Sequence, residues 1–423
     1  MNPSFEREWR TKVRAVRASN FWQHVSTPPY ARIEPALQRP RRGQVALSPD
    51  WMICLVGEVT DQGPATAGAE DLQHFLKKRL GLKLRLSRAR LEGDPSPCLV
   101  LQVRPGRTPA DRWCSRFQLD VERDGITVTA PNEPALLRAC LWLSNYWSLR
   151  RNAHLPLGTR RIRATVDLHI GADLWGGFST TQAWPHGRER DDNFIELARM
   201  GLTATPVMTV LEDYLLPVEG PFAQLAHPDA KANRRRLKQL ARASARRGIH
   251  IMLMGYNPKL TPEDPFFRQR PRSRGALQAG GAFRPLCTSD PATRKFIADS
   301  WASLFEEIPE LGGIIAITGG EGFYHCFMRS ATQAADCPRC GKRHGPEVVA
   351  ELVNSIARRI RQAQPEARLT TWPYSAGHWS GDRDQDDYIA ALDPDHVIFQ
   401  TEVDKDSVDW REAGYAKDCW DYS

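Results

Sequence analysis

A regular alternation of strands and helices after residue 161 constrains the fold of this chain most. Short apolar runs are each followed by a helical pattern of apolar residues. The expected strands are 163–170, 203–209, 249–256, 311–317, 369–372 and 396–401, and the helices between them are 192–200, 229–247, 291–307 and 347–363. Strands that alternate with helices in this way form parallel sheets. We therefore expect an α/β fold, with a (β/α)8 barrel of the TIM type over residues 161–423.

The number of strands is too small for a complete barrel. Only six expected strands fit before Ser423. An eight-stranded barrel without its last strands would expose unpaired strand edges. The count favours a truncated version of a longer protein, and closure by other means, such as a homodimer, is the alternative.

A different pattern precedes the barrel. Residues 1–44 form a basic, proline-containing extension, and residues 45–160 read as a small α+β domain with five strands and two helices. Asp124-Gly125 separates two alternating runs and is typical of a hairpin turn. Asn132 has the position of a helix N-cap.

Composition excludes several classes of protein. Hydrophobic residues make up 41% and charged residues 26%, as in ordinary globular proteins. No apolar run is long enough to span a bilayer, and the N-terminus lacks a signal-peptide apolar region, so we expect a cytoplasmic protein without a membrane partner. The net charge of +8 is spread over many arginines and comes with no nucleic-acid motif, so we expect no nucleic-acid partner. The arginine-rich run 234–247 is interpreted as the solvent face of a helix that buries Leu237, Leu240 and Ala241.

The stretch LGGIIAITGGEGFYH, residues 311–325, supplies the strongest candidate site. Its β-branched run reads as a strand buried on both faces. The first acid after this strand is Glu321, and aromatic residues follow it. Active sites of α/β barrels are built at the carboxyl ends of their strands, so Glu321 is expected at such a site.

The ends of the other expected strands carry acids and aromatic rings, a combination that suits a carbohydrate ligand. The candidate substrate-binding residues are His169, Asp213, Tyr256, Asn257, Tyr324, His325, Trp372, Tyr374 and Trp379. For His169, a structural role as a hydrogen-bonded residue is the preferred interpretation over a catalytic one.

Glycoside hydrolysis uses two carboxyl groups, one protonated and one ionised. Glu321 is the candidate acid, because the apolar run before it would raise its pKa. Glu402 or Asp404 is the candidate partner, and no cofactor is required for this chemistry. A solvent-exposed structural role is the alternative for both partners.

A cysteine cluster follows the central strand. Cys326, Cys337, Cys340 and His344 have side chains that bind zinc, and four such ligands complete a tetrahedral structural site. Reduced thiols or one local disulfide are the alternatives. The nine cysteines as a whole show no regular spacing and do not predict a disulfide framework.

With these motifs the chain resembles glycoside hydrolase family 20, the β-N-acetylhexosaminidase-like barrel proteins. The run FQLDVERDGITVTAPNEPALLRACLWL is similar to the α/β domain that precedes the barrel in that family. The runs LCTSDPATRKF, GGIIAITGGEGFYHCFMR and DCPRCGKR are similar to barrel segments of less studied relatives. The resemblance implies a glycosidase that acts on a glycan, with a β-linked amino sugar as one substrate class.

One departure from the family pattern concerns the catalytic strand. Family 20 has an HxGGDE motif there, in which the final glutamate is the acid, whereas here Glu321 falls on the aspartate and Gly322 on the glutamate. This difference favours another two-carboxyl arrangement, or a non-catalytic barrel that binds carbohydrate. Zinc-dependent nucleic-acid binding is the remaining, disfavoured alternative.

Overall fold

The computed structural model describes residues 40–88, 97–107, 110–171, 188–319, 322–328, 334–373 and 384–400. The chain divides into two compact units. In the described ranges the first unit comprises residues 40–167, 192–201 and 246–248, and the second comprises the remaining residues. None of the helices in these ranges combines the length and hydrophobicity that crossing a bilayer requires.

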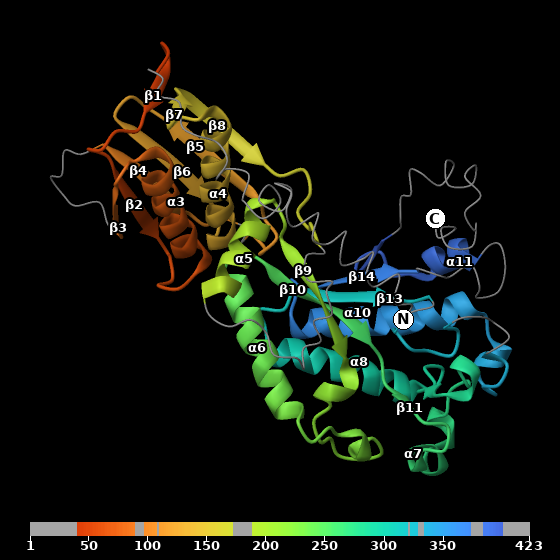
Figure 1. Cartoon of the computed structure of the whole chain (residues 1–423). Coiled ribbons are helices and arrows are strands. Elements are labelled where there is room, and N and C mark those ends of the chain that lie inside the picture. The colour runs from red at the N-terminus through yellow and green to blue at the C-terminus, as the bar shows by residue number, and fades with distance from the viewer. Residues whose placement is uncertain are drawn as a thin grey trace, which may run out of the picture. The chain divides into compact units, whose positions relative to one another are not determined.

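The first unit is built on a six-stranded mixed sheet of order β3-β2-β4-β6-β5-β8 (Figure 1). Its elements are β1 (Gln44–Ala46), β2 (Met52–Gly57), α3 (Pro64–Leu80), β3 (Arg85–Ser87), β4 (Cys98–Val103), β5 (Arg116–Val121), β6 (Gly125–Ala130), α4 (Glu133–Arg150), β7 (His154–Pro156) and β8 (Gly158–Arg163). Helices α3 and α4 contact one another, and their apolar faces share one core with the sheet. The expected hairpin is confirmed, because β5 and β6 pair antiparallel. The expected cap is confirmed as well, because Asn132 Oδ1 accepts a hydrogen bond from the Ala135 amide at 2.9 Å.

The elements of the chain after Arg163 alternate as the sequence predicts. They are α5 (Arg188–Arg199), β9 (Ala204–Val210), α6 (Ala230–Arg246), β10 (His250–Tyr256), β11 (Lys259–Leu260), α7 (Pro265–Gln269), β12 (Arg284–Pro285), α8 (Pro291–Glu307), β13 (Gly313–Ile317), α10 (Gly345–Ala363), β14 (Arg368–Trp372), α11 (Asp384–Ala391) and β15 (Val397–Phe399). Strands β9, β10, β13, β14 and β15 form one parallel sheet in which each strand lies beside the next long strand of the chain. Strands β10 and β13 are both buried along almost their whole length, as expected for a sheet covered on both faces.

Two expectations about the barrel are corrected. The expected first strand, 163–170, does not form: β8 ends at Arg163 in the first unit's sheet, and only Ile170 makes a parallel bridge, to Ala204. The described residues of the second unit therefore form an open five-stranded sheet, and they do not close a barrel. The sheet has the strand order of part of a (β/α) barrel, because neighbours in sequence are neighbours in the sheet.

The arginine-rich helix α6 differs from its expected pattern at one residue. Leu237, Leu240 and Ala241 are buried, as predicted. Arg234 is also buried, and its guanidinium donates to Glu307 Oε2 at 3.1 Å and to Ser303 Oγ at 2.7 Å. A buried guanidinium requires such partners, so this residue belongs to the helix contacts and not to a solvent face.

Candidate functional site

The parallel register brings the carboxyl ends of four strands to one level of the second unit. Tyr256 pairs with Val210, and Ile317 pairs with Trp372. Met254 pairs with Ile315, which places the ends of β10 and β13 side by side. Side chains that directly follow these strands therefore gather where the C-terminal ends of the strands lie, and we call this side of the sheet the carboxyl edge. Proteins of the α/β class bind their ligands there.

Among the described carboxyl groups at this edge, Glu212 has the most strongly shifted pKa. It lies in a short 3-10 turn directly after β9, and its Oε1 accepts a hydrogen bond from the Lys259 amide at 2.9 Å. Its Oε2 is buried and has no hydrogen-bond partner among the described residues. Burial raises the pKa of Glu212 to about 7, although the Lys259 amide acts in the opposite direction. A carboxyl group with such a pKa is about half protonated at neutral pH, and its protonated form can donate a proton.

The adjacent Asp213, which the sequence proposed as a substrate-binding residue, is held by structural contacts. Its backbone carbonyl accepts from Asn233 Nδ2 at 2.7 Å, and its carboxylate lies 4.0 Å from His227 Nε2. Burial raises the pKa of Asp213, and His227 opposes that shift. Both acids follow the same strand, and the sequence proposed Asp213, whereas the buried Glu212 carboxyl has the larger shift in pKa.

Three aromatic rings and one lysine contact one another at this edge. Lys259 Nζ donates to the Tyr324 hydroxyl at 2.8 Å and lies 4.4 Å from the centre of the Tyr324 ring. It also lies 4.5 Å from the centre of the Phe283 ring, and the Tyr256 and Tyr324 rings meet edge to face. The structure therefore brings the predicted pair Tyr256 and Tyr324 together, and Lys259 connects them to the turn that carries Glu212.

Asn257 and His325 are buried beside this edge and make hydrogen bonds to neighbouring parts of the protein. Asn257 is fully buried, and its Oδ1 accepts a hydrogen bond from Trp301 Nε1 at 2.9 Å. His325 is also fully buried: its Nδ1 accepts from the Phe327 amide at 3.1 Å, so its Nε2 carries the proton that is donated to the Thr318 carbonyl at 2.7 Å. Burial lowers the pKa of His325 to about 4, which leaves the ring neutral at physiological pH. Both side chains hold loops in place through contacts within the protein.

The remaining predicted residues fall into three groups. Trp372 ends β14 at the same level as Ile317 and is half-buried. His169 lies at the opposite edge of the sheet, because its carbonyl accepts from the Thr203 amide at 2.9 Å and Ile170 pairs with Ala204 at the start of β9. The residues outside the described ranges are Glu321, Tyr374, Trp379, Glu402 and Asp404.

Gly322 is packed too closely for any side chain. A Cβ atom at this position would lie 1.7 Å from the Tyr256 ring. The glutamate that the family pattern has here would need Tyr256 or the backbone to move. This contact explains in physical terms why the chain has glycine at the position where the pattern has its acid.

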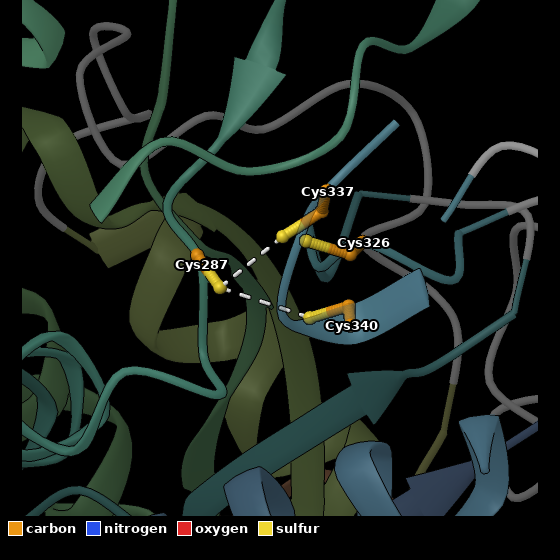
Figure 2. Close-up of side chains that lie close together, drawn as sticks. All are labelled: Cys287, Cys326, Cys337 and Cys340. Carbon is orange, nitrogen blue, oxygen red and sulfur yellow. Dashed lines mark hydrogen bonds between the residues drawn. The ribbon is translucent and has the colours of Figure 1, made fainter. Parts of the chain in front are cut away.

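A second cluster joins four cysteines in the second unit. The sulfur atoms of Cys287, Cys326, Cys337 and Cys340 lie within 4.8 Å of one another, and all four residues are buried. Figure 2 shows the four sulfur atoms facing a common centre. Cys287 Sγ lies 3.5 Å from Cys337 Sγ and 3.7 Å from Cys340 Sγ. The hydrogen bond with Cys326 lowers the pKa of Cys287 to about 7, and that with Cys340 acts in the same direction, whereas Cys337 and burial oppose the shift.

The fourth member of this cluster is corrected. Cys287 occupies the position that the sequence assigned to His344, whose Nε2 instead contacts Asp387 Oδ2 at 2.9 Å. His344 is the N-cap residue of α10, and its side chain pairs with Asp387 of α11. Cys287 comes from a distant loop before α8, and no local spacing connects it to the other three cysteines.

The second unit thus defines a class of α/β protein with a parallel sheet and a polar, aromatic carboxyl edge. No protein-family model matches the sequence, and a search of the curated proteins found no match. Solved structures do match. An enzyme of glycoside hydrolase family 138 that targets pectin rhamnogalacturonan II is 14% identical, with 82% of this chain and 38% of that chain covered and a TM-score of 0.50. That likeness shows a shared fold.

Structures of glycoside hydrolase family 20 are also similar to this chain. The chitobiase of Flavobacterium johnsoniae is 13% identical, with 89% of this chain and 56% of that chain covered and a TM-score of 0.49. The β-N-acetylhexosaminidase of Streptomyces coelicolor A3(2) is 14% identical, with 88% and 75% covered and a TM-score of 0.47. The chain spans about half the length of the chitobiase and less than half of the family 138 enzyme.

Proposed function

We propose that this chain is a glycoside hydrolase-like protein that binds a glycan at the carboxyl edge of its parallel sheet. Glu212 carries the proposal, because its buried carboxyl group has a pKa of about 7 at the edge where α/β proteins place their sites. In this proposal Glu212 donates a proton to the leaving oxygen of the glycosidic bond. The aromatic rings of Tyr256 and Tyr324 would stack on the sugar faces, and a β-linked amino sugar is the first substrate class to test.

Glycoside hydrolysis also needs an ionised carboxylate. Glu321 is the proposed second group, since it follows β13 in the sequence between Gly319 and Gly322, and Glu402 and Asp404 are the alternatives. The sequence favoured Glu321 as the acid. The raised pKa of Glu212 supports giving Glu212 the acid role and Glu321 the role of nucleophile or base.

The test compares Glu212→Gln with Glu219→Gln, an exposed glutamate seven positions along the chain. Both variants are assayed on aryl glycosides and on unactivated oligosaccharides. We expect Glu212→Gln to lower kcat on oligosaccharides by about 10²–10⁴-fold, and less on aryl glycosides whose leaving group needs no proton. Glu219→Gln should match the wild type. Equal activity of all three proteins on every cleaved substrate would remove Glu212 from the mechanism.

Glu321 is tested separately. Glu321→Gln should lower kcat on both substrate types, because a nucleophile or base acts whatever the leaving group is. Unchanged turnover in Glu321→Gln would move the second role to Glu402 or Asp404, whose Gln and Asn variants are then assayed in the same way.

A carbohydrate-binding protein without turnover is the second candidate function. Gly322 favours it, because the contact with Tyr256 leaves no room for the glutamate of the family motif. Thermal stabilisation by a sugar that the protein does not cleave would support binding alone. Turnover that is lost in Glu212→Gln would reject this candidate.

A further inference from the structure

The four-cysteine cluster has the dimensions of a metal-thiolate centre. Zinc–sulfur bonds are about 2.3 Å long, so sulfur atoms at the corners of a tetrahedron around zinc lie about 3.8 Å apart. The separations of 3.5 Å and 3.7 Å from Cys287 Sγ agree with this value, and all four sulfur atoms lie within 4.8 Å of one another. A disulfide would need sulfur atoms about 2.05 Å apart, and the described cysteines form none.

Cys287 is held by backbone contacts that do not depend on a metal. The Cys287 amide donates to the Ser273 carbonyl at 2.8 Å, and the Asp290 amide donates to the Cys287 carbonyl at 3.1 Å. Asp290 then caps α8 by accepting from the Thr293 amide at 3.2 Å. The loop of Cys287 is therefore fixed from both sides, which preorganises one ligand position.

The Cys337–Cys340 pair lies in a tight turn of the kind that zinc knuckles use. The Gly341 amide donates to the Cys337 carbonyl at 2.9 Å, and the Arg343 amide donates to the Cys340 carbonyl at 2.9 Å. A Cβ atom at Gly341 would lie 2.8 Å from Ala335 Cα, so the turn closes this tightly only with glycine. The turn directs both sulfur atoms toward Cys287, as Figure 2 shows.

One guanidinium group and one backbone amide donate to sulfur atoms of the cluster. Arg339 Nε donates to Cys287 Sγ at 3.3 Å, and the Ala276 amide donates to Cys326 Sγ at 3.4 Å. Four thiolates around a divalent cation carry a net charge of −2, and such donors stabilise that charge. Neutral thiols buried in an apolar core would need no guanidinium beside them.

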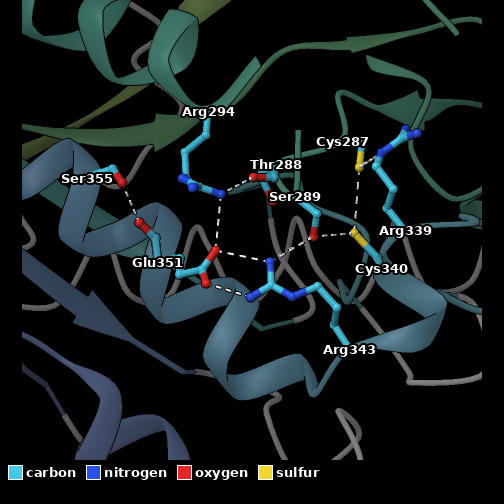
Figure 3. Close-up of polar contacts among 9 residues, drawn as sticks. All are labelled: Cys287, Thr288, Ser289, Arg294, Arg339, Cys340, Arg343, Glu351 and Ser355. Atoms are coloured by element: carbon cyan, nitrogen blue, oxygen red, sulfur yellow. Dashed lines mark hydrogen bonds and ion pairs between the residues drawn. The ribbon is translucent and has the colours of Figure 1, made fainter. Parts of the chain in front are cut away.

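A second layer of contacts ties the cluster to helix α10. Ser289 Oγ contacts Cys340 Sγ at 3.2 Å and accepts from Arg343 Nη1 at 3.3 Å (Figure 3). Arg343 also pairs with Glu351, and Arg294 donates to the same carboxylate at 3.1 Å. The hydrogen bond from Arg343 lowers the pKa of Glu351, and burial opposes this shift to a smaller extent. The carboxylate therefore stays ionised and the network stays charged. Such outer contacts are typical of metal sites, where they orient the ligands.

We propose that Cys287, Cys326, Cys337 and Cys340 bind one zinc ion as a closed tetrathiolate centre. Four protein ligands leave no open position for water or substrate, so the ion is structural. It joins the loop before α8, the segment 322–328 after β13 and the turn before α10. Cys326 lies two residues after Tyr324, so the ion fixes the segment that contributes Tyr324 to the carboxyl edge. The inference does not depend on the proposed glycosidase activity.

The first test measures the metal in the full chain purified without chelator. We expect one zinc per chain by elemental analysis, and release of that zinc when a mercurial reagent titrates four thiols. After exchange, cobalt(II) should give the visible and thiolate charge-transfer bands of a tetrahedral tetrathiolate. Zinc-free protein with four freely titrating thiols, iron in place of zinc, or a cobalt spectrum with nitrogen ligation would each overturn the proposal.

Variants identify the ligands. Cys287→Ser should lower the zinc content at least tenfold, whereas Cys114→Ser, at a half-buried cysteine outside the cluster, should retain one zinc. His344→Ala should also retain it, because His344 contacts Asp387. Loss of zinc in His344→Ala with retention in Cys287→Ser would overturn the proposed ligand set. If Cys287→Ser does not fold, the cobalt spectrum of the wild type decides between four sulfur ligands and three.

Hydrogen exchange tests the structural role. Removing zinc with a chelator should increase amide exchange at least tenfold in segments 284–289, 322–328 and 334–342, while the β5–β6 hairpin of the first unit stays protected. Equal exchange in all of these segments before and after zinc removal would contradict the proposal that the ion holds them together.

Discussion

At the scale of single residues, the environment of Glu212 decides what the carboxyl edge can do. Oε1 of Glu212 accepts a hydrogen bond from the Lys259 amide, and Oε2 is buried without a hydrogen-bond partner among the described residues. An ionised carboxylate in this position would leave an uncompensated charge in a poorly solvated place. The group therefore keeps a substantial protonated fraction up to about pH 7, which is the property that a general acid needs.

The raised pKa has a consequence for stability. The pKa of Glu212 rises from 4.5 in the unfolded chain to about 7 in the folded chain, so the folded state binds the extra proton between these values. The stabilisation is complete below pH 4.5 and is lost as the pH rises through 7. It is worth at most about 3 kcal/mol. We expect the free energy of unfolding of Glu212→Gln to fall less steeply than that of the wild type from pH 4.5 to 7 in urea titrations. Parallel curves for the two proteins would show that the carboxyl group ionises normally.

The contact between Gly322 and Tyr256 gives a second residue-scale prediction. Gly322→Ala places a methyl group against the Tyr256 ring, so we expect it to lower the free energy of unfolding by about 1–3 kcal/mol. In Tyr256→Ala the ring is absent, and the same substitution should cost less than half as much. Chemical denaturation of the two single variants and the double variant gives the coupling energy. Additive effects would mean that the ring does not limit this position.

At the scale of elements, the segment 322–328 links the central strand to both clusters. Tyr324 contacts Lys259, His325 contacts the Thr318 carbonyl at the end of β13, and Cys326 enters the cysteine cluster. Three successive residues thus serve three different neighbours. The segment has a defined conformation because each side chain has its own partner.

His325 is the residue through which this element can be tested. His325→Ala removes two hydrogen bonds in a fully buried place, so we expect a loss of about 2–4 kcal/mol in the free energy of unfolding. His344→Ala is the matched control, and it should change stability by less than about 1 kcal/mol because its contact with Asp387 is exposed. Urea denaturation followed by fluorescence compares the two variants. Similar small losses in both would mean that His325 does not hold the segment.

At the scale of the whole molecule, the first unit has a core of its own. All members of its main cluster of buried residues lie between Val45 and Leu155. A fragment that comprises residues 40–167 should therefore fold alone and unfold cooperatively, as measured by circular dichroism and by the dispersion of its amide NMR spectrum. A fragment without a cooperative transition would show that this core needs the rest of the chain.

Sequence patterns predicted the elements of this molecule better than its long-range contacts. Helix α8 was predicted with the observed bounds, and the strands β9, β10, β13 and β14 within one or two residues, because each has a clear apolar period. The first barrel strand was predicted wrongly, because the apolar alternation around Arg163 suits β8 in the other sheet equally well. Local patterns do not state which sheet a strand joins.

The candidate sites show the same limit. Three of the four clustered cysteines were predicted from their spacing, but Cys287 approaches them only through the fold. His169 seemed to end a strand, yet the register with Thr203 places it at the start of β9. Glu212 and Asp213 were equivalent in sequence, and only burial of one carboxyl group distinguishes them.

The protonation state of Glu212 tests the central claim most directly. Carbon-13 labelling of the glutamate carboxyl groups, with the Glu212 resonance assigned by its absence in Glu212→Gln, allows the group to be titrated by NMR. The account predicts a midpoint near pH 7 for this resonance. A midpoint near 4.5, the value of an ordinary glutamate, would contradict it and remove the proton donor from the carboxyl edge.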